Sequence, residues 1–145
     1  DYYASRGLGD VYKRQTTTVM NVTELRDYCL SLPMVTEDFP FNESILAFKI
    51  LGKIFAVIDL DHIDWLVMKC DPDYAVELRE SHPEITTAWH WNKKYWNQVR
   101  MRGALTDELI ISLLRHSYSE VVKKFTGKIK REYPILLTVQ SPANH

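Results

Sequence analysis

Cysteine is scarce in this sequence: Cys29 and Cys70 are the only two among 145 residues. They lack the short paired spacing of metal-binding cysteines, and each lies in a segment of apolar pattern. We therefore expect buried, reduced thiols, because free cysteine packs as a small apolar residue and cytosolic thiols stay reduced. This scarcity argues against a disulfide-stabilised secreted domain.

Long apolar runs are also missing. The hydrophobic stretches are short and interrupted by charged residues, whereas a membrane-spanning helix needs about 20 predominantly apolar residues. The sequence as given opens with no charged-then-apolar leader and cleavage site. We expect a cytoplasmic protein without membrane contact.

The short motifs of several enzyme classes do not occur. There is no phosphate loop ending in Gly-Lys-Ser/Thr, no Gly-x-Ser-x-Gly, no His-Glu-x-x-His and no paired Cys-x-x-Cys. The five histidines are scattered at no ligand spacing, and His116, beside Ser117 and Tyr118, suggests a buried polar network. We therefore expect a protein that is not an enzyme and that has no catalytic residue, cofactor or metal ion.

One acidic segment could be taken for a cation site. Asp59, Asp61, His62 and Asp64 bring carboxylates and an imidazole together at short spacing, and such groups are ligands of divalent cations. The glycine and the terminal glutamate of a calcium-binding loop are missing, however. We interpret the segment as a solvent-facing turn.

The net charge of −1 hides an asymmetry. Residues 21–90 contain five Lys/Arg and thirteen Asp/Glu, a balance of −8, whereas residues 91–133 contain ten and four, a balance of +6. A basic half permits an anionic partner without requiring one, since many basic surfaces are only solvated.

The first nineteen residues look foreign to the domain. Residues 5–15 resemble translated sequencing-adaptor read-through, and the segment has no amphipathic periodicity. We expect residues 1–19 to be a non-native or disordered extension and Met20 to be the native start. A short ordered extension is the alternative.

Residues 20–133 carry the patterns of one folded domain. Asn21 and Glu24 form the Asn-x-x-Glu pattern of a capping box, and Asp71 and Thr106 can cap two further helices. The expected helices are 21–32, 71–82 and 106–125, followed by a basic helical continuation at 128–131. The expected strands are 35–41 at an edge, 44–50, 53–60 and 65–70, and residues 85–101 should form two strands or a strand and a loop. Turns are expected at Leu51-Gly52 and Gly103, and a frayed tail at 134–145.

The order of these elements indicates the fold class. Hairpin-length connections join the strands, so the sheet should be antiparallel, and the strand-helix alternation of a doubly wound sheet is missing. We predict a single α+β domain whose helices gather on one face of the sheet.

Residues 85–101 contain many side chains that are suited to binding. Three of the four tryptophans lie here with His90, two asparagines and two adjacent lysines. Aromatic faces supply contact area, and the polar groups supply donors that suit phosphates or other anions. Ordinary construction of a half-buried strand explains the same composition.

The sequence resembles the MmcQ/YjbR family over nearly all of residues 20–125. No single motif is specific, but their order and spacing are. The motifs are Leu25-Arg26-x-Tyr28-Cys29-Leu30-Ser31-Leu32-Pro33, Glu37-x-Phe39-Pro40-Phe41, Phe48-Lys49-x-x-Gly52-Lys53-x-Phe55-Ala56, Lys69-Cys70-x-Pro72, His90-x-Asn92-Lys93-Lys94-x-Trp96 and His116-Ser117-Tyr118.

This resemblance implies a frataxin-like fold similar to that of CyaY and a proposed role in DNA binding through a double-wing arrangement of sheet and loops. Family members often carry glycine where Met34 and Asn42 stand, and a small residue near Ala88-Trp89. The local turns are therefore expected to differ at these positions.

In a DNA-binding role, the basic and aromatic residues are expected to contact the DNA. Lys93 and Lys94 are the first choices for phosphates, while His90 and Asn92 suit orientation or contact with a base. Trp96 either stacks on a base or lies in the core, which its apolar spacing favours. The full set is Lys69, His90, Asn92, Lys93, Lys94, Trp96, Arg100 and Arg102.

Two alternatives to this role remain. The aromatic cluster could form a cleft for a small ligand or a partner protein. The acidic residues of 21–90 permit a frataxin-like role with iron. Few cations are available for DNA, so modest affinity is expected.

Overall fold

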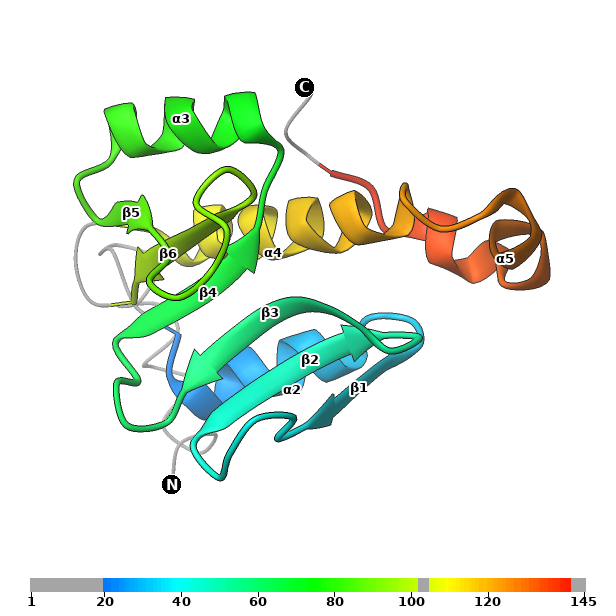
Figure 1. Ribbon diagram of the computed structural model, residues 1–145, viewed down its shortest axis with the longest axis horizontal. Helices are drawn as coiled ribbons and strands as arrows, with labels where there is room; N and C mark the ends of the chain where they lie inside the picture. Colours follow the sequence, from blue (N-terminus) through cyan, green and yellow to red (C-terminus); the bar gives the residue numbers. More distant parts are fainter. Residues whose placement is uncertain (1–19, 102–104, 142–145) are drawn as a thin grey trace, which may run out of the picture.

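The computed structural model describes residues 20–101 and 105–141 (Figure 1). In chain order the elements are α2 (Val22–Ser31), β1 (Val35–Asp38), β2 (Ile45–Ile50), β3 (Lys53–Asp59), β4 (Trp65–Lys69), α3 (Pro72–Ser81), β5 (Ile85–Thr87), β6 (Trp96–Arg100), α4 (Asp107–Val122), α5 (Gly127–Glu132) and the 3-10 helix η1 (Pro134–Thr138). The predictions for residues 1–19, Arg102, Gly103 and residues 142–145 lie outside the described residues.

The six strands form one antiparallel sheet in the order β1-β2-β3-β4-β6-β5. Leu51 and Gly52 join β2 to β3 with φ values of 48° and 88°, as the left-handed residues of a two-residue hairpin turn require. α3 and β5 come between β4 and β6 in the chain, and β5 lies beyond β6 at the edge. The predicted single-domain α+β fold is confirmed.

Side-chain caps fix the starts of three helices. Asn21 Oδ1 accepts a hydrogen bond from Glu24 N at 2.8 Å, and Asn21 N donates to Glu24 Oε1 at 3.1 Å, which completes the predicted capping box. Asp71 and Thr106 each accept from the backbone N–H three residues later. These caps satisfy N–H groups that a helix start leaves without an intrahelical partner.

The helices pack on one face of the sheet, where the main core lies, as predicted. Because side chains alternate along a strand, every second residue of β4 points into this core. Figure 1 shows α2 and α4 behind the strands. Buried residues that meet there include Leu25 of α2, Leu66 and Met68 of β4, Ala75 of α3, Leu114 of α4 and Leu136 of η1.

Three consecutive buried residues of α4 anchor it to other segments of the chain. His116 Nε2 accepts from Asp71 N at 3.1 Å, where α3 begins. The Tyr118 hydroxyl donates to Pro33 O at 2.6 Å, just after α2. The buried polar network predicted around His116 is therefore confirmed.

Ser117, the middle residue of the three, completes the sheet between β3 and β4. The pairing of these strands ends at Ala56 and Met68. Beyond this last pair, Phe55 O on β3 and Lys69 N on β4 are bridged by a side chain. Ser117 Oγ accepts a hydrogen bond from Lys69 N at 3.0 Å and donates one to Phe55 O at 2.5 Å. The hydroxyl therefore links the two strands where they have separated.

The C-terminal segment differs from the frayed tail expected at 134–145. Pro134–Thr138 is a 3-10 helix, and Leu136 and Val139 are buried, at 0% and 7% exposure. A turn of 3-10 helix is too short to show a periodic apolar pattern, so no helical signal was visible at these residues. The burial of two apolar side chains holds the segment against the core.

Candidate functional site

No helix among residues 20–101 and 105–141 covers the second face of the sheet, which we call the helix-free face. On β4 and β6, this face presents the residues that alternate with the core residues. They oppose one another in three cross-strand pairs: Lys69 with Trp96, Val67 with Gln98, and Trp65 with Arg100.

Each end of this three-pair ladder carries a cation beside a tryptophan. Lys69 Nζ lies 5.5 Å from the centroid of the Trp96 ring, and the Arg100 guanidinium carbon lies 5.9 Å from that of Trp65. Such cation–π contacts contribute about 0.5–1 kcal/mol at exposed sites. Four residue steps separate the two ends, which corresponds to about 13 Å along a strand.

Three lysines surround Tyr95 at one end of the ladder. Their Nζ atoms lie 5.7 Å (Lys69), 5.5 Å (Lys94) and 5.9 Å (Lys124) from the centroid of its ring. They come from β4, from the loop before β6 and from the residues just after α4. We call this group the lysine cluster.

Charges around the lysine cluster remain largely positive. Partial burial holds the pKa of the Lys69 ammonium below its ordinary value of 10.5, and the nearby Lys124 lowers it further, while Glu120 and Tyr95 raise it. Glu120 is itself paired with Lys123 at 2.9 Å. The four lysines and one glutamate leave a formal charge of +3, so this corner of the molecule favours an anion.

The loop between β5 and β6 folds over the helix-free face. Trp91 packs on Trp96, with ring centroids 4.6 Å apart at an angle of 44°. Asn92 shapes the turn, because its Oδ1 accepts from Lys94 N at 2.9 Å. His90 has a φ of 67°, a left-handed conformation that turns the chain beside Trp89, whose side chain is 73% exposed.

An aromatic cleft of about 710 Å³ lies on the helix-free face beneath this loop. The Phe41 ring lies 6.2 Å from the ring of Trp91 in an edge-to-face arrangement. The cleft is lined by Phe41, Asn42, Ile45, Val57, Asp59, His62, Trp65, Val67, Trp89, His90, Trp91 and Gln98. Four of these twelve residues are Phe or Trp, three are aliphatic and five carry polar side chains.

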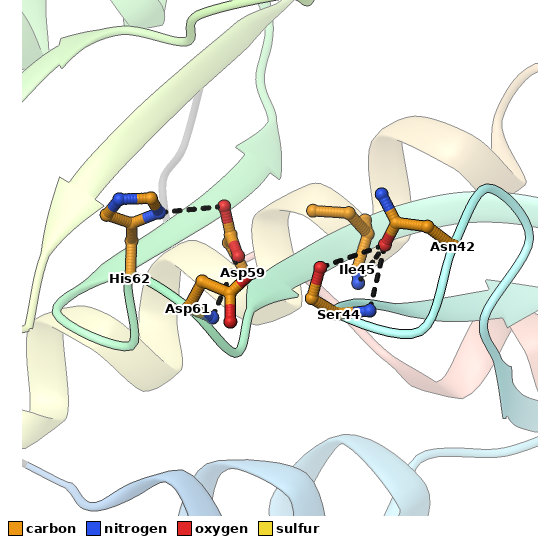
Figure 2. A network of polar contacts seen from close by, with 6 residues as sticks. All are labelled: Asn42, Ser44, Ile45, Asp59, Asp61 and His62. Carbon is orange, nitrogen blue, oxygen red and sulfur yellow. Dashed lines mark hydrogen bonds and ion pairs between the residues drawn. The ribbon is translucent and has the colours of Figure 1, made fainter.

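Two short loops hold the polar side of the cleft (Figure 2). Asn42 Oδ1 accepts from the backbone N–H groups of Ser44 and Ile45 at 2.8 and 3.0 Å. Asp59 Oδ1 accepts from the backbone N–H of residue 61 at 2.9 Å, and its Oδ2 lies 3.1 Å from His62 Nδ1. The acidic segment is therefore folded as a turn on its own backbone.

Neither a metal site nor a membrane span is found among the described residues. No three histidine, cysteine, aspartate or glutamate side chains come together there in a way that could hold a metal ion. No helix of the described ranges is long and apolar enough to cross a bilayer.

The structure brings together some of the predicted site residues and separates others. Lys69, Lys94 and Trp96 meet at the lysine cluster, whereas Arg100 lies at the opposite end of the ladder. Lys93 is exposed in the loop before β6. Trp96 is half-buried and packs against a small apolar cluster of Ala47, Val57, Val67 and Ala88 on the helix-free face, outside the main core.

Two residues of the lysine cluster were not among the predicted ones. Tyr95 is the ring that the three lysines share, and Lys124 reaches it from the end of α4. The basic balance of residues 91–133 was the available signal. It could not identify Lys124, because the contact depends on how α4 crosses the sheet.

The fold and the site define a class: a small α+β domain with helices on one face of an antiparallel sheet and a cation-bordered aromatic cleft on the other. The family model of YjbR matches residues 30–120. The chain therefore belongs to the YjbR family, as the sequence motifs predicted. The matched range runs from the end of α2 into α4 and contains the whole lining of the cleft.

Relatives and solved structures agree with this assignment. The chain is 27% identical to the uncharacterized protein YjbR and 32% identical to the uncharacterized protein YbdF, both of Escherichia coli. Each match spans 104 residues, 71% of this chain and 88% or 83% of the relative.

Two crystal structures resemble the structure of this chain. A Deinococcus radiodurans protein with a DUF419 domain has a TM-score of 0.75 and 38% identity over 82% of this chain and 91% of its own. A Pseudomonas syringae protein has a TM-score of 0.58 and 26% identity over 68% of this chain and 96% of its own. The likeness to CyaY stays a prediction.

Proposed function

We propose that this protein is a non-enzymatic, cytoplasmic DNA-binding protein that holds phosphates at the lysine cluster. The observation that carries the proposal is the approach of Lys69, Lys94 and Lys124 to within 6 Å of one tyrosine ring. Phosphates are the groups through which proteins gain most of their sequence-independent affinity for DNA. Arg100 adds a further cation about 13 Å along the same face.

The depressed pKa of Lys69 supports an anionic ligand. Its ammonium is kept from water by partial burial and repelled by Lys124. A phosphate placed among the lysines would offset the effect of both on the Lys69 pKa, because an opposite charge favours the protonated form. The small number of cations makes the affinity modest and strongly dependent on salt.

The test measures fluorescence anisotropy of a labelled DNA duplex at several salt concentrations. We expect the logarithm of the binding constant to fall linearly with the logarithm of salt, by about 0.9 for each phosphate neutralised. In the double variant Lys94→Ala/Lys124→Ala the slope should become shallower by about 1.8 if each lysine neutralises one phosphate. Both side chains are exposed, so the fold should be retained.

The matched control is Lys128→Ala/Arg131→Ala in α5, which removes the same charge from residues that are not part of the lysine cluster. It should leave the salt slope close to that of the unchanged protein. A Lys94→Ala/Lys124→Ala variant with an unchanged slope, or binding that does not respond to salt, would contradict the proposal.

The aromatic cleft supports a second candidate, a binding module for a small ligand or a partner protein. Its volume of about 710 Å³ lies within the range of about 300–1,000 Å³ that small-molecule sites occupy. A thermal shift produced by a metabolite or partner, and none produced by duplex DNA, would select this candidate.

A further inference from the structure

The aromatic cleft and the cations of the helix-free face form one continuous surface. Trp91 lines the cleft and packs on Trp96, which lies beneath Lys69 of the lysine cluster. At the other end, Trp65 lines the cleft and lies beneath Arg100. A ligand in the cleft therefore has a cation at each end of the ladder.

The walls of the cleft suit a flat ring. Phe41 and Trp89 are 63% and 73% exposed, although both line the cleft. Large apolar rings left in water at one place mark a surface that binds something. The flat face of any nucleobase can stack on aromatic side chains, whichever base it is. The exposed rings of this lining suit such stacking.

The polar groups of the cleft determine which part of a nucleic acid enters it. Asp59 places a carboxylate in the lining and would repel a phosphate. The same carboxylate can accept a hydrogen bond from the amino group of a base, and Gln98 and Asn42 offer amide groups nearby. The lining therefore suits a base better than a phosphate, and the lysines and Arg100 suit phosphates.

A base in a duplex cannot reach this lining. Its faces are covered by the neighbouring base pairs, and it must leave the stack before a protein can enclose it. An unpaired base presents both faces at once. The requirement distinguishes single-stranded from double-stranded DNA, since both offer phosphates to the lysine cluster.

We propose, resting on the DNA-binding function above, that the aromatic cleft takes an unpaired base of single-stranded DNA while the lysine cluster and Arg100 hold the flanking phosphates. The protein then binds single strands in preference to duplexes. Bases with an exocyclic amino group are preferred over thymine because Asp59 accepts their hydrogen bond.

The experiment compares three labelled 16-nucleotide DNAs by fluorescence anisotropy at one salt concentration: a mixed-sequence single strand, its duplex, and a single strand with abasic residues at its centre. The single strand should bind about ten-fold more tightly than either of the others, a difference of about 1.4 kcal/mol. Tryptophan fluorescence should be quenched by the mixed-sequence strand and not by the abasic strand.

Trp89→Ala tests the cleft directly. Because the side chain is 73% exposed, its removal should leave the fold intact, and it should weaken single-strand binding more than duplex binding, lowering their ratio by about ten-fold, or about 1.4 kcal/mol. Ile135→Ala, which removes an exposed apolar side chain from η1, is the matched control and should leave the ratio unchanged.

The outcomes separate the two proposals. Equal affinity for the single strand, the abasic strand and the duplex would overturn this inference and leave the DNA-binding function standing. Failure of all three DNAs to bind would overturn both. Tighter binding of an RNA of the same sequence would overturn the assignment of the strand to DNA.

Discussion

The two faces of the sheet arise from the same strands but differ in composition and exposure. On the helix-covered face, Phe48, Phe55 and Tyr118 are fully buried. On the helix-free face, the apolar cluster of Ala47, Val57, Val67 and Ala88 is small. Tryptophans and cations of this face remain partly in water. The comparison suggests that stability depends mainly on one face, while the other is available for binding.

The largest expected effect comes from Phe55→Ala on the helix-covered face. Phe55 is 0% exposed and its ring meets that of Tyr118 edge to face at 5.7 Å. Truncation should lower the free energy of unfolding by about 3–5 kcal/mol, because it removes buried surface and leaves a cavity. Urea denaturation measures this loss.

Trp89→Ala is the counterpart on the helix-free face, where the free energy of unfolding should change by no more than about 0.5 kcal/mol. If the two substitutions destabilised the protein equally, the division between the faces would be wrong.

Ser117→Ala should cost about 2 kcal/mol. Its Oγ serves Lys69 N and Phe55 O where β3 and β4 have separated, so the substitution leaves buried backbone groups without partners. Ser119→Ala on the same helix is the control, since Ser119 Oγ only donates to His116 O within the helix. Equal stabilities of the two variants in urea would show that the link across the strands is unimportant.

Met34→Gly should stabilise the protein by about 0.5–1 kcal/mol. Met34 has a φ of 63°, which a side chain disfavours and glycine adopts without strain. The side chain is 39% exposed, so little buried surface is lost. Met34→Ala keeps the Cβ atom and should show no such gain in thermal or urea unfolding. A gain of the same size from alanine would mean that backbone strain is not the cause.

The smallest effect concerns the pH dependence of Lys69. The pKa of the Lys69 ammonium is lower in the folded protein than its ordinary value of 10.5. At pH values between the folded-state pKa and 10.5, the unfolded chain therefore binds more protons than the folded protein. Stability should therefore rise with pH through this window. Lys69→Gln removes the contribution.

Only the difference between the stability curves of the unchanged and Lys69→Gln proteins reports this contribution. The thiols of Cys29 and Cys70 have raised pKa values through burial and act in the opposite direction. Parallel curves in urea unfolding from pH 8 to 11 would contradict the expectation.

Local signals in the sequence predicted the elements well. The capping box at Asn21 and Glu24, the Asp71 cap and the Leu51-Gly52 turn each depend on neighbours within a few residues. The α+β fold followed from their order. The tail at 134–145 did not follow, because the burial of Leu136 depends on a core assembled from distant segments.

The candidate site was predicted only in part, because it depends on contacts between distant residues. The sequence placed Lys69, Lys94 and Arg100 in one group, but the register of β4 and β6 sets Arg100 at the far end of the ladder. Asn92 was a candidate for base contact, yet its side-chain oxygen forms a turn. That turn was locally readable, since asparagine commonly accepts from the backbone two residues on.

Within the described residues, the sheet ends at β1 and β5, and both strands are short. An exposed edge offers free backbone groups to a second chain and can seed aggregation. On β1, Glu37 is paired with Arg26 and Asp38 with Lys49. Desolvating these ion pairs would oppose the addition of another strand. The Arg26 guanidinium lowers the pKa of the Glu37 carboxyl, so this ion pair and the protection it gives the edge should persist below the ordinary carboxyl range.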